Sequence, residues 1–351
     1  MSDWDPGGEP ARLAAQQGIH CLPIPTPFAV GRVNCYLIDD EPLTLLDSGP
    51  NSGRALDELE RALAAHGRRV EDLGLILVSH QHMDHVGLVD ILARRSGAEV
   101  AALGLLAPWL SRFGEFQDAD DAFAEAVMAR NGIPQETRLA LRAVSQAFRG
   151  WGARADVTKS LADGDTVTLR DRTLAVHHRP GHSPSDTVFH DTARGTLLAA
   201  DHLIAHISSN PLIARPLEAP DDATAAGEIE RPQSLRIYIE SLRATRAMKD
   251  VRLVLPGHGA AITDHGALID ERLRLHARRA HRIHRLIAEQ PQTAFEIAQA
   301  MWGNVAVTQA YLTLSEVLGH VDLLLNDGLV AEREGEGGVV RFESVAAPAD
   351  G

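Results

Sequence analysis

Seven potential metal ligands stand just past apolar, strand-like runs, and this pattern limits the possible folds more than any other feature. The ligands are His80, His82, Asp84 and His85 in SHQHMDH, His182 in RPGHS, Asp201 in LLAAD, and His258 in LPGHG. The runs that precede the four groups are LGLILVS, RTLAVHHR, TLLAA and VRLVL. Because strand ends deliver side chains to one edge of a sheet, four strands can converge on one point. The sequence therefore predicts an α/β fold with a single metal centre at a sheet edge.

The types of ligand indicate hydrolytic chemistry. Neutral imidazole and carboxylate groups suit zinc and its first-row neighbours, and the absence of cysteine ligands argues against a closed structural zinc site. Seven ligands are too many for one tetrahedral ion with an open position. They suit two ions about 3.5–4 Å apart that share a carboxylate and a bridging water. Such a centre supplies hydroxide near neutral pH and polarises a carbonyl or phosphoryl group.

The ordered set of His80-x-His82-x-Asp84-His85 followed by His182, Asp201 and His258 resembles the metallo-β-lactamase superfamily over residues 19–265. The resemblance implies an αβ/βα sandwich with two zinc ions in a groove at one edge of its two sheets; manganese or iron would suit the same ligands. It implies that His80, His82 and His182 hold the first ion. Asp84, His85 and His258 would hold the second ion, and Asp201 would bridge the two.

The same resemblance assigns further roles. Asp47, in the motif DSG, matches the aspartate that supports a metal-binding histidine, although a simple turn aspartate is the alternative. Asp84 would orient the nucleophile and shuttle a proton. His82 stands where flavodiiron-type relatives carry glutamate, which favours hydrolysis over redox chemistry. Asp201 resembles the bridging aspartate of the glyoxalase II, lactonase and nuclease branches, which true zinc β-lactamases usually lack.

The pattern of elements predicts a catalytic domain over residues 1–268 and a winged-helix-like domain over residues 269–345. A helical insert is expected at about residues 105–155. Six of the fifteen aromatic residues fall there, at Trp109, Phe113, Phe116, Phe123, Phe148 and Trp151. One interpretation is that they pack the insert onto the core; the other is a lid that covers the metal pocket and receives an apolar part of the substrate.

The C-terminal part of the sequence bears on whether the protein binds nucleic acid. Its order of three helices and a hairpin is that of a winged helix, and with the loop ISSNP it resembles the lactamase-beta-like subgroup. That subgroup includes thioesterase-like enzymes and an animal endoribonuclease. The candidate recognition helix at residues 310–327 contains no Lys or Arg, so its leucines fit packing or a homodimer better than base contacts.

The preceding helix is rich in arginine instead, with Arg272, Arg274, Arg278, Arg279, Arg282 and Arg285. A solvated face or a surface of intramolecular ion pairs is the simpler interpretation of that run. A contact to an anion, to the phosphates of coenzyme A or to RNA is the alternative.

Charge and cysteine content narrow the class of protein. The net charge of −14 opposes nonspecific attraction to nucleic acid and anionic membranes. Cys21 and Cys35 are expected to be buried free thiols, which points to the cytoplasm. The first residues show no basic region followed by an apolar stretch, and no run reaches the roughly 18 apolar residues of a membrane span. Neither a signal peptide nor a transmembrane helix is expected.

These observations predict a cytoplasmic dinuclear zinc hydrolase that cleaves a small ester, thioester or lactone by metal-bound hydroxide. A metal-dependent endoribonuclease is the alternative. His202 and His206 stand close enough to Asp201 in the sequence to line a pocket, but ordinary loop histidines are the simpler interpretation.

Overall fold

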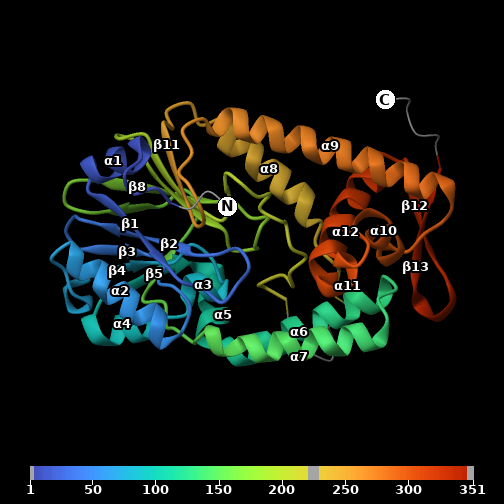
Figure 1. Ribbon diagram of the computed structural model, residues 1–351, viewed down its shortest axis with the longest axis horizontal. Coiled ribbons are helices and arrows are strands. Elements are labelled where there is room, and N and C mark those ends of the chain that lie inside the picture. The colour runs from blue at the N-terminus through green and yellow to red at the C-terminus, as the bar shows by residue number, and fades with distance from the viewer. Residues whose placement is uncertain (1–3, 220–228, 346–351) are drawn as a thin grey trace. The chain divides into compact units, whose positions relative to one another are not determined.

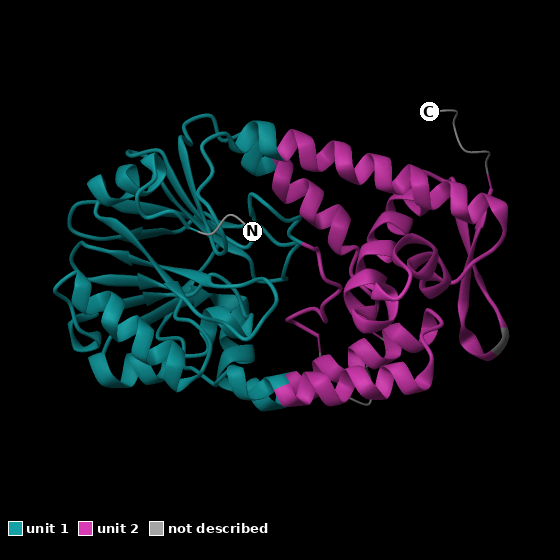
Figure 2. Cartoon of the chain, viewed as in Figure 1, with its two compact units in different colours: residues 1–116, 148–209, 244–268 teal, residues 117–147, 210–243, 269–351 magenta. Residues whose placement is uncertain are grey.

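The computed structural model describes residues 4–219 and 229–345, which divide into two compact units (Figure 2). Unit 1 comprises residues 1–116, 148–209 and 244–268, and unit 2 comprises residues 117–147, 210–243 and 269–351. The chain therefore passes between the units five times. The predicted division into domains 1–268 and 269–345 stays a prediction. The units differ from it in that part of the predicted insert and residues 210–243 belong to unit 2.

Unit 1 contains two β-sheets (Figure 1). The first has the order β1-β2-β3-β4-β5-β6, formed by Ile19–Ile24, Val33–Ile38, Thr44–Leu46, Leu75–Leu77, Glu99–Leu103 and Lys159–Leu161. Strands β1 to β3 pair antiparallel and β3 to β6 pair parallel. The β2–β3 pair is a hairpin that ends just before Asp47, and in it Tyr36 lies opposite Leu46.

The second sheet has the order β11-β10-β9-β8-β7. In chain order its strands are β7 Thr166–Thr168, β8 Thr173–His178, β9 Thr187–Asp191, β10 Thr196–Ala200 and β11 Leu253–Pro256. Only the β10–β11 pair is parallel.

The two sheets pack face to face through apolar side chains, and most of their strands are buried at every position, as strands covered on both faces are. One buried cluster unites Tyr36, Leu75 and Leu77 of the first sheet with Val176 and Leu255 of the second. The expected sandwich is therefore present.

Helices accompany the sheets of unit 1. They are α1 Glu9–Gln16, α2 Gly53–Ala65, α3 Met83–Val86, α4 Val89–Ser96 and α5 Ala107–Ser111. Helix α2 begins after Ser52, whose Oγ accepts a hydrogen bond from the Ala55 amide at 3.1 Å. Helix α4 ends at Ser96, and the Gly97 that follows has a φ of 73°, the left-handed conformation typical of a helix end.

Helices make up most of unit 2. The helices with residues in this unit are α6 Phe113–Arg130, α7 Gln135–Phe148, α8 Ser234–Arg246, α9 His265–Glu289, α10 Ala294–Trp302, α11 Val305–Thr308 and α12 Ala310–Asn326. The hairpin of β12 Val330–Glu334 and β13 Val340–Ser344 follows them. The predicted order of three helices and a hairpin is present, with the short α11 in addition.

The burial of α12 explains its leucines. Leu314, Leu318 and Leu324 lie in the core cluster of unit 2 together with Phe123 and Phe295. The packing interpretation therefore holds for these three leucines, whereas Leu312 is 39% exposed. A homodimer stays a prediction.

The arginines of α9 are partly a solvated face and partly engaged in an intramolecular ion pair, the two simpler roles expected of them. Arg274, Arg278, Arg282 and Arg285 are exposed or partly exposed, and Arg279 forms an ion pair with Glu316.

The aromatic residues of the predicted insert mostly pack. Trp109, Phe113, Phe116 and Phe123 are buried, whereas Phe148 remains 39% exposed. A lid role for this region stays a prediction. Within residues 4–219 and 229–345, no helix combines the length and apolar character needed to cross a lipid bilayer.

Candidate metal centre

Unit 1 brings all seven predicted ligands into two adjoining groups of side chains. The first contains His80, His82, His182 and Asp201, and the second contains Asp84, His85 and His258. In each group the ligand atoms lie within 4.8 Å of one another. Strand β4 of the first sheet leads to His80, while β8, β10 and β11 of the second lead to His182, Asp201 and His258. The strand-end prediction is therefore confirmed.

In the first group, three ring nitrogens meet. His80 Nε2 and His182 Nε2 each lie 3.0 Å from His82 Nδ1. His82 Nδ1 has one proton or one lone pair, so it makes a well-directed hydrogen bond with only one of them at a time. Zn–N distances of about 2.0–2.1 Å separate tetrahedral ligands by roughly 3.3 Å. The triangle of nitrogens therefore fits a shared cation better than a set of hydrogen bonds.

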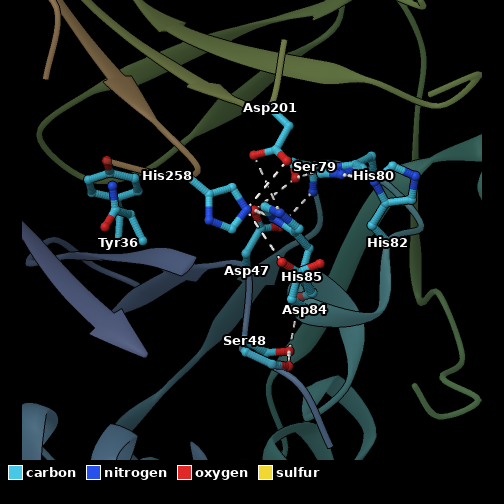
Figure 3. A network of polar contacts seen from close by, with 12 residues as sticks. Tyr36, Asp47, Ser48, Ser79, His80, His82, Asp84, His85, Asp201 and His258 are labelled. Atoms are coloured by element: carbon cyan, nitrogen blue, oxygen red, sulfur yellow. Dashed lines mark hydrogen bonds and ion pairs between the residues drawn. The ribbon is translucent and has the colours of Figure 1, made fainter. Parts of the chain in front are cut away.

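The second group converges in the same way (Figure 3). His258 Nε2 lies 3.3 Å from Asp84 Oδ2 and 3.4 Å from Asp201 Oδ2. His85 Nε2 lies 3.5 Å from Asp201 Oδ1, and among the described residues neither of these two buried atoms has a hydrogen-bond partner. Buried polar atoms that face one another without bonding call for a bound group between them.

Asp201 lies between the two groups. Its Oδ1 faces His85, and its Oδ2 faces His258 and, at 3.6 Å from Nε2, His182. The carboxylate thus presents oxygens to histidines of both groups. The backbone supports this position, since Ala200 just before it has a φ of +43°, a left-handed conformation that is costly for alanine.

Asp47 supports one histidine of each group. Its Oδ2 accepts a hydrogen bond from His85 Nδ1 at 2.7 Å, which leaves Nε2 of that ring for the centre. Its carboxylate also accepts hydrogen bonds from the Ser79 amide at 2.9 Å and the Ser79 hydroxyl at 2.8 Å. The Ser79 Oγ accepts a hydrogen bond from His80 Nδ1 at 2.9 Å, so His80 Nε2 is also left for a ligand role. Asp47 is more than a turn residue, although its φ of +59° does place it in a tight turn.

His258 is fixed by backbone. Its Nδ1 donates to the carbonyl of Arg32 at 2.8 Å, and it forms an isolated β-bridge with Val33. Asn34 holds the surrounding loop through hydrogen bonds from Nδ2 to the carbonyls of Pro256 and Gly259. The side chain of His258 therefore has one orientation imposed on it from β2.

The electrostatics of the site favour bound cations. Burial and the neighbouring His182 lower the pKa of His82 to about 3, so that its imidazole is neutral. Burial opposes a charged His258, but Asp201 and Asp84 outweigh it and raise the pKa of His258 to about 10. The buried carboxylates therefore draw positive charge to this point, and divalent ions would satisfy them better than protons.

Some residues of the site were missed from the sequence. Ser79 directly precedes His80, and its position at a strand end was the signal that could have identified it. Gly257 is required by contact, because a Cβ atom there would lie 2.1 Å from Asp201 Oδ1. Asp186 holds the loop that carries His182 by accepting hydrogen bonds from the Ser183 amide at 2.9 Å and hydroxyl at 2.7 Å. Unlike His182, Asp186 gave no signal in the sequence.

The two histidines that follow Asp201 remain outside the ligand groups. His202 is buried and its Nε2 lies 2.8 Å from Thr245 Oγ1, a contact within unit 1 that fits a structural role. His206 is partly buried. Neither belongs to a ligand group of the described residues.

Comparison with known proteins supports this description. Residues 29–258 match the family described as the metallo-beta-lactamase superfamily. The chain belongs to that superfamily. Residues 281–345 match the family described as the metallo-beta-lactamase-like C-terminal domain. As the sequence predicts, the chain is a metal-dependent hydrolase of the superfamily.

Relatives of this superfamily member align over nearly the whole chain. It is 32% identical to the probable metallo-hydrolase YqjP of Bacillus subtilis, over 94% of this chain and 98% of that protein. Among solved structures, a beta-lactamase domain protein from Burkholderia ambifaria is 26% identical, with a TM-score of 0.77 over 93% of this chain and 92% of its own. A metallo-beta-lactamase family protein from Thermus thermophilus is 25% identical, with a TM-score of 0.74 over 93% of this chain and 98% of its own.

Proposed function

We propose that this hydrolase holds two zinc ions and cleaves a small ester, thioester or lactone. The position of Asp201 carries the proposal, since its Oδ2 faces histidines of both groups and its Oδ1 faces His85. One ion with an open position needs three protein ligands, and seven are present. Bound at this point, the ions would supply an activated water and Lewis acidity toward a carbonyl oxygen.

The residues of the chain would divide the work. His80, His82 and His182 would hold one ion and Asp84, His85 and His258 the other, with Asp201 shared. Asp84 stands in the first turn of α3 with Oδ2 toward His258, and this carboxylate would orient the nucleophile and accept its proton. Asp47 keeps His85 and, through Ser79, His80 turned toward the centre.

A small acyl substrate agrees with the charge of the chain better than a polyanion does. The net charge of −14 opposes attraction of nucleic acid, and α12 offers buried leucines in place of basic groups. The two free cysteines favour the cytoplasm as the compartment in which the enzyme works.

An assay of the zinc-loaded protein tests the proposal. Thioesters, aryl esters, lactones and a β-lactam would be compared with a single-stranded RNA, each with a chelator-treated control. We expect chelator-sensitive turnover of at least one acyl compound and no cleavage of RNA. RNA cleavage without acyl turnover would overturn the proposed substrate class in favour of the ribonuclease.

Asp201→Asn tests the shared carboxylate. The amide keeps the shape but loses the charge that two ions would share, so we expect bound zinc and kcat/KM to fall together. Asp57→Asn, on the exposed face of α2, is the matched control and should change neither. Unaltered zinc content and turnover in Asp201→Asn would refute the bridging role.

A further inference from the structure

Unit 2 contains a second cluster of metal-ligating side chains that sequence reasoning did not single out. His276 of α9 and Glu316 and His320 of α12 each offer one ligand atom, and these atoms lie within 4.8 Å of one another. The three residues are 2%, 7% and 0% exposed. Glu316 and His320 are four residues apart, which puts both on one face of α12.

The hydrogen bonds orient His320 as a ligand. Its Nδ1 donates to the backbone carbonyl of Glu316 at 2.6 Å, so its Nε2 carries a lone pair. Histidines that bind metals commonly donate their other ring nitrogen to a carbonyl in this way. The lone pair points to His276, whose Nδ1 lies 3.2 Å away. This separation is close to the roughly 3.3 Å between tetrahedral ligands at Zn–N distances of about 2.0–2.1 Å.

The cluster contains one carboxylate and two neutral rings, and an arginine competes for the carboxylate. Burial lowers the pKa of both His276 and His320 to about 4, so protons do not compete with a metal for the rings near neutral pH. Glu316 provides a carboxylate, and Arg279 contacts it as an ion pair. The ring of Tyr238 of α8 lies edge-on to the ring of His276, with 6.5 Å between the two ring centroids.

We propose that His276, Glu316 and His320 form an additional site for a divalent first-row ion such as Zn²⁺, which joins α9 to α12 within unit 2. Three protein ligands leave one position for water. Without an ion, His276 Nδ1 and His320 Nε2 form a hydrogen-bonded pair, and the nearby Glu316 carboxylate is held by Arg279.

Counting bound zinc tests the site. The full-length protein, stripped of metal and then dialysed against Zn²⁺, would be analysed beside His276→Gln, His320→Gln and Glu316→Gln. We expect the native protein to bind one equivalent more than either histidine variant, and Glu316→Gln to bind that equivalent at least tenfold more weakly. His281→Gln removes a histidine of the same helix outside the cluster and should bind as the native protein does. The difference in bound zinc between the native protein and the histidine variants does not depend on how many ions unit 1 holds. The additional site can therefore be disproved while the proposed function stands.

Arg279→Gln provides a test in the opposite direction. Because the guanidinium competes with a cation for Glu316, its removal should tighten binding of the additional zinc by several-fold. This variant keeps all three ligands, so it remains informative if a histidine variant does not fold. Equal zinc content in the native protein and the histidine variants would overturn the site. If the histidine variants do not fold, an unchanged zinc affinity in Arg279→Gln would overturn it.

Discussion

At the scale of single residues, Asp47 supports both ligand groups of the centre. It holds one histidine of each ligand group, directly for His85 and through Ser79 for His80. Replacing such a supporting carboxylate costs about 10–100-fold in metal affinity or activity. We therefore expect Asp47→Asn to lower zinc affinity and kcat/KM within that range.

Ser79→Ala is the natural comparison for this prediction. It disturbs His80 but leaves the bond between Asp47 and His85, so its loss should be smaller than that of Asp47→Asn. Zinc affinity measured by competition with a chelator dye would decide the order. A larger loss in Ser79→Ala would show that Asp47 acts mainly elsewhere.

Gly257 leads to a second prediction at this scale. A Cβ atom there would lie 2.1 Å from Asp201 Oδ1 and 2.9 Å from His85 Cε1, too close for any real structure. Gly257→Ala must move the shared carboxylate, and we expect zinc to be lost at concentrations that saturate the native protein. Gly53→Ala, whose Cβ would meet nothing within 4 Å, is the control. Native zinc binding by Gly257→Ala would show that the loop can shift without cost.

The sequence singled out the candidate ligands that the fold brings together because each is a chemically distinctive residue at the end of an apolar run. It did not identify Ser79, Gly257 or Asp186, since serine, glycine and aspartate occur in ordinary loops and their roles depend on contacts across the fold. The cluster of His276 and His320 escaped for the same reason. Those histidines are 44 positions apart, and only the packing of α9 against α12 brings them together.

At the scale of elements, a buried ion pair connects the two sheets. Asp40 follows β2 of the first sheet, and its Oδ2 lies 3.0 Å from Nε of Arg172, in the turn between β7 and β8 of the second. Breaking a buried pair leaves an uncompensated charge and costs about 3–5 kcal/mol. We expect Arg172→Met to lower the free energy of unfolding by an amount in that range, measured by urea denaturation.

The neighbouring pair of Arg170 and Glu41 is a control within the same turn. Both side chains are exposed, so Arg170→Gln should change stability by less than about 1 kcal/mol. Equal effects of the two substitutions would mean that burial does not distinguish them.

The buried pair of Asp40 and Arg172 predicts that the stability of the fold depends on pH. Burial opposes a charged Asp40, but hydrogen bonds from the amides of Glu41 and Asp171 and from Arg172 outweigh it and lower the pKa of this carboxyl. A lowered pKa stabilises the fold above the unfolded value of about 3.9, and this contribution is lost as the pH falls through the folded value. The difference in unfolding free energy between the native protein and Asp40→Asn should therefore be constant from about pH 5 to 8 and shrink in acid below about pH 4. A difference that grows in acid would contradict the assignment.

The elements themselves were predicted with their order and type. The four strands that lead to the ligands, the helical insert and the C-terminal order of helices and hairpin all follow from apolar period and turn residues. What the pattern could not give is which segments share a core. Residues 117–147 and 210–243 belong to unit 2 because their apolar side chains pack there, and this partnership has no local signal.

At the scale of the whole molecule, unit 2 is built from segments far apart in the chain. Phe123, Val127 and Met128 of α6 lie in the same buried cluster as Phe295 and Leu318. Removing residues 269–351 would expose these three side chains of α6 to water. We expect the remaining 1–268 fragment to aggregate, as judged by its soluble fraction and by size-exclusion chromatography beside the full chain. A soluble, monomeric fragment that binds zinc would show that unit 1 tolerates the loss.

The ligands of the centre come from both sheets of the sandwich, with His80 after β4 on one side and His182, Asp201 and His258 after strands of the other. The complete set therefore exists only once the two sheets have met, and an unfolded chain offers no equivalent. An ion that binds the folded form alone adds to its stability by mass action, about 2.7 kcal/mol when free metal is at 100 times its dissociation constant. The supply of metal in the surroundings would then govern how long each molecule survives as well as how fast it works.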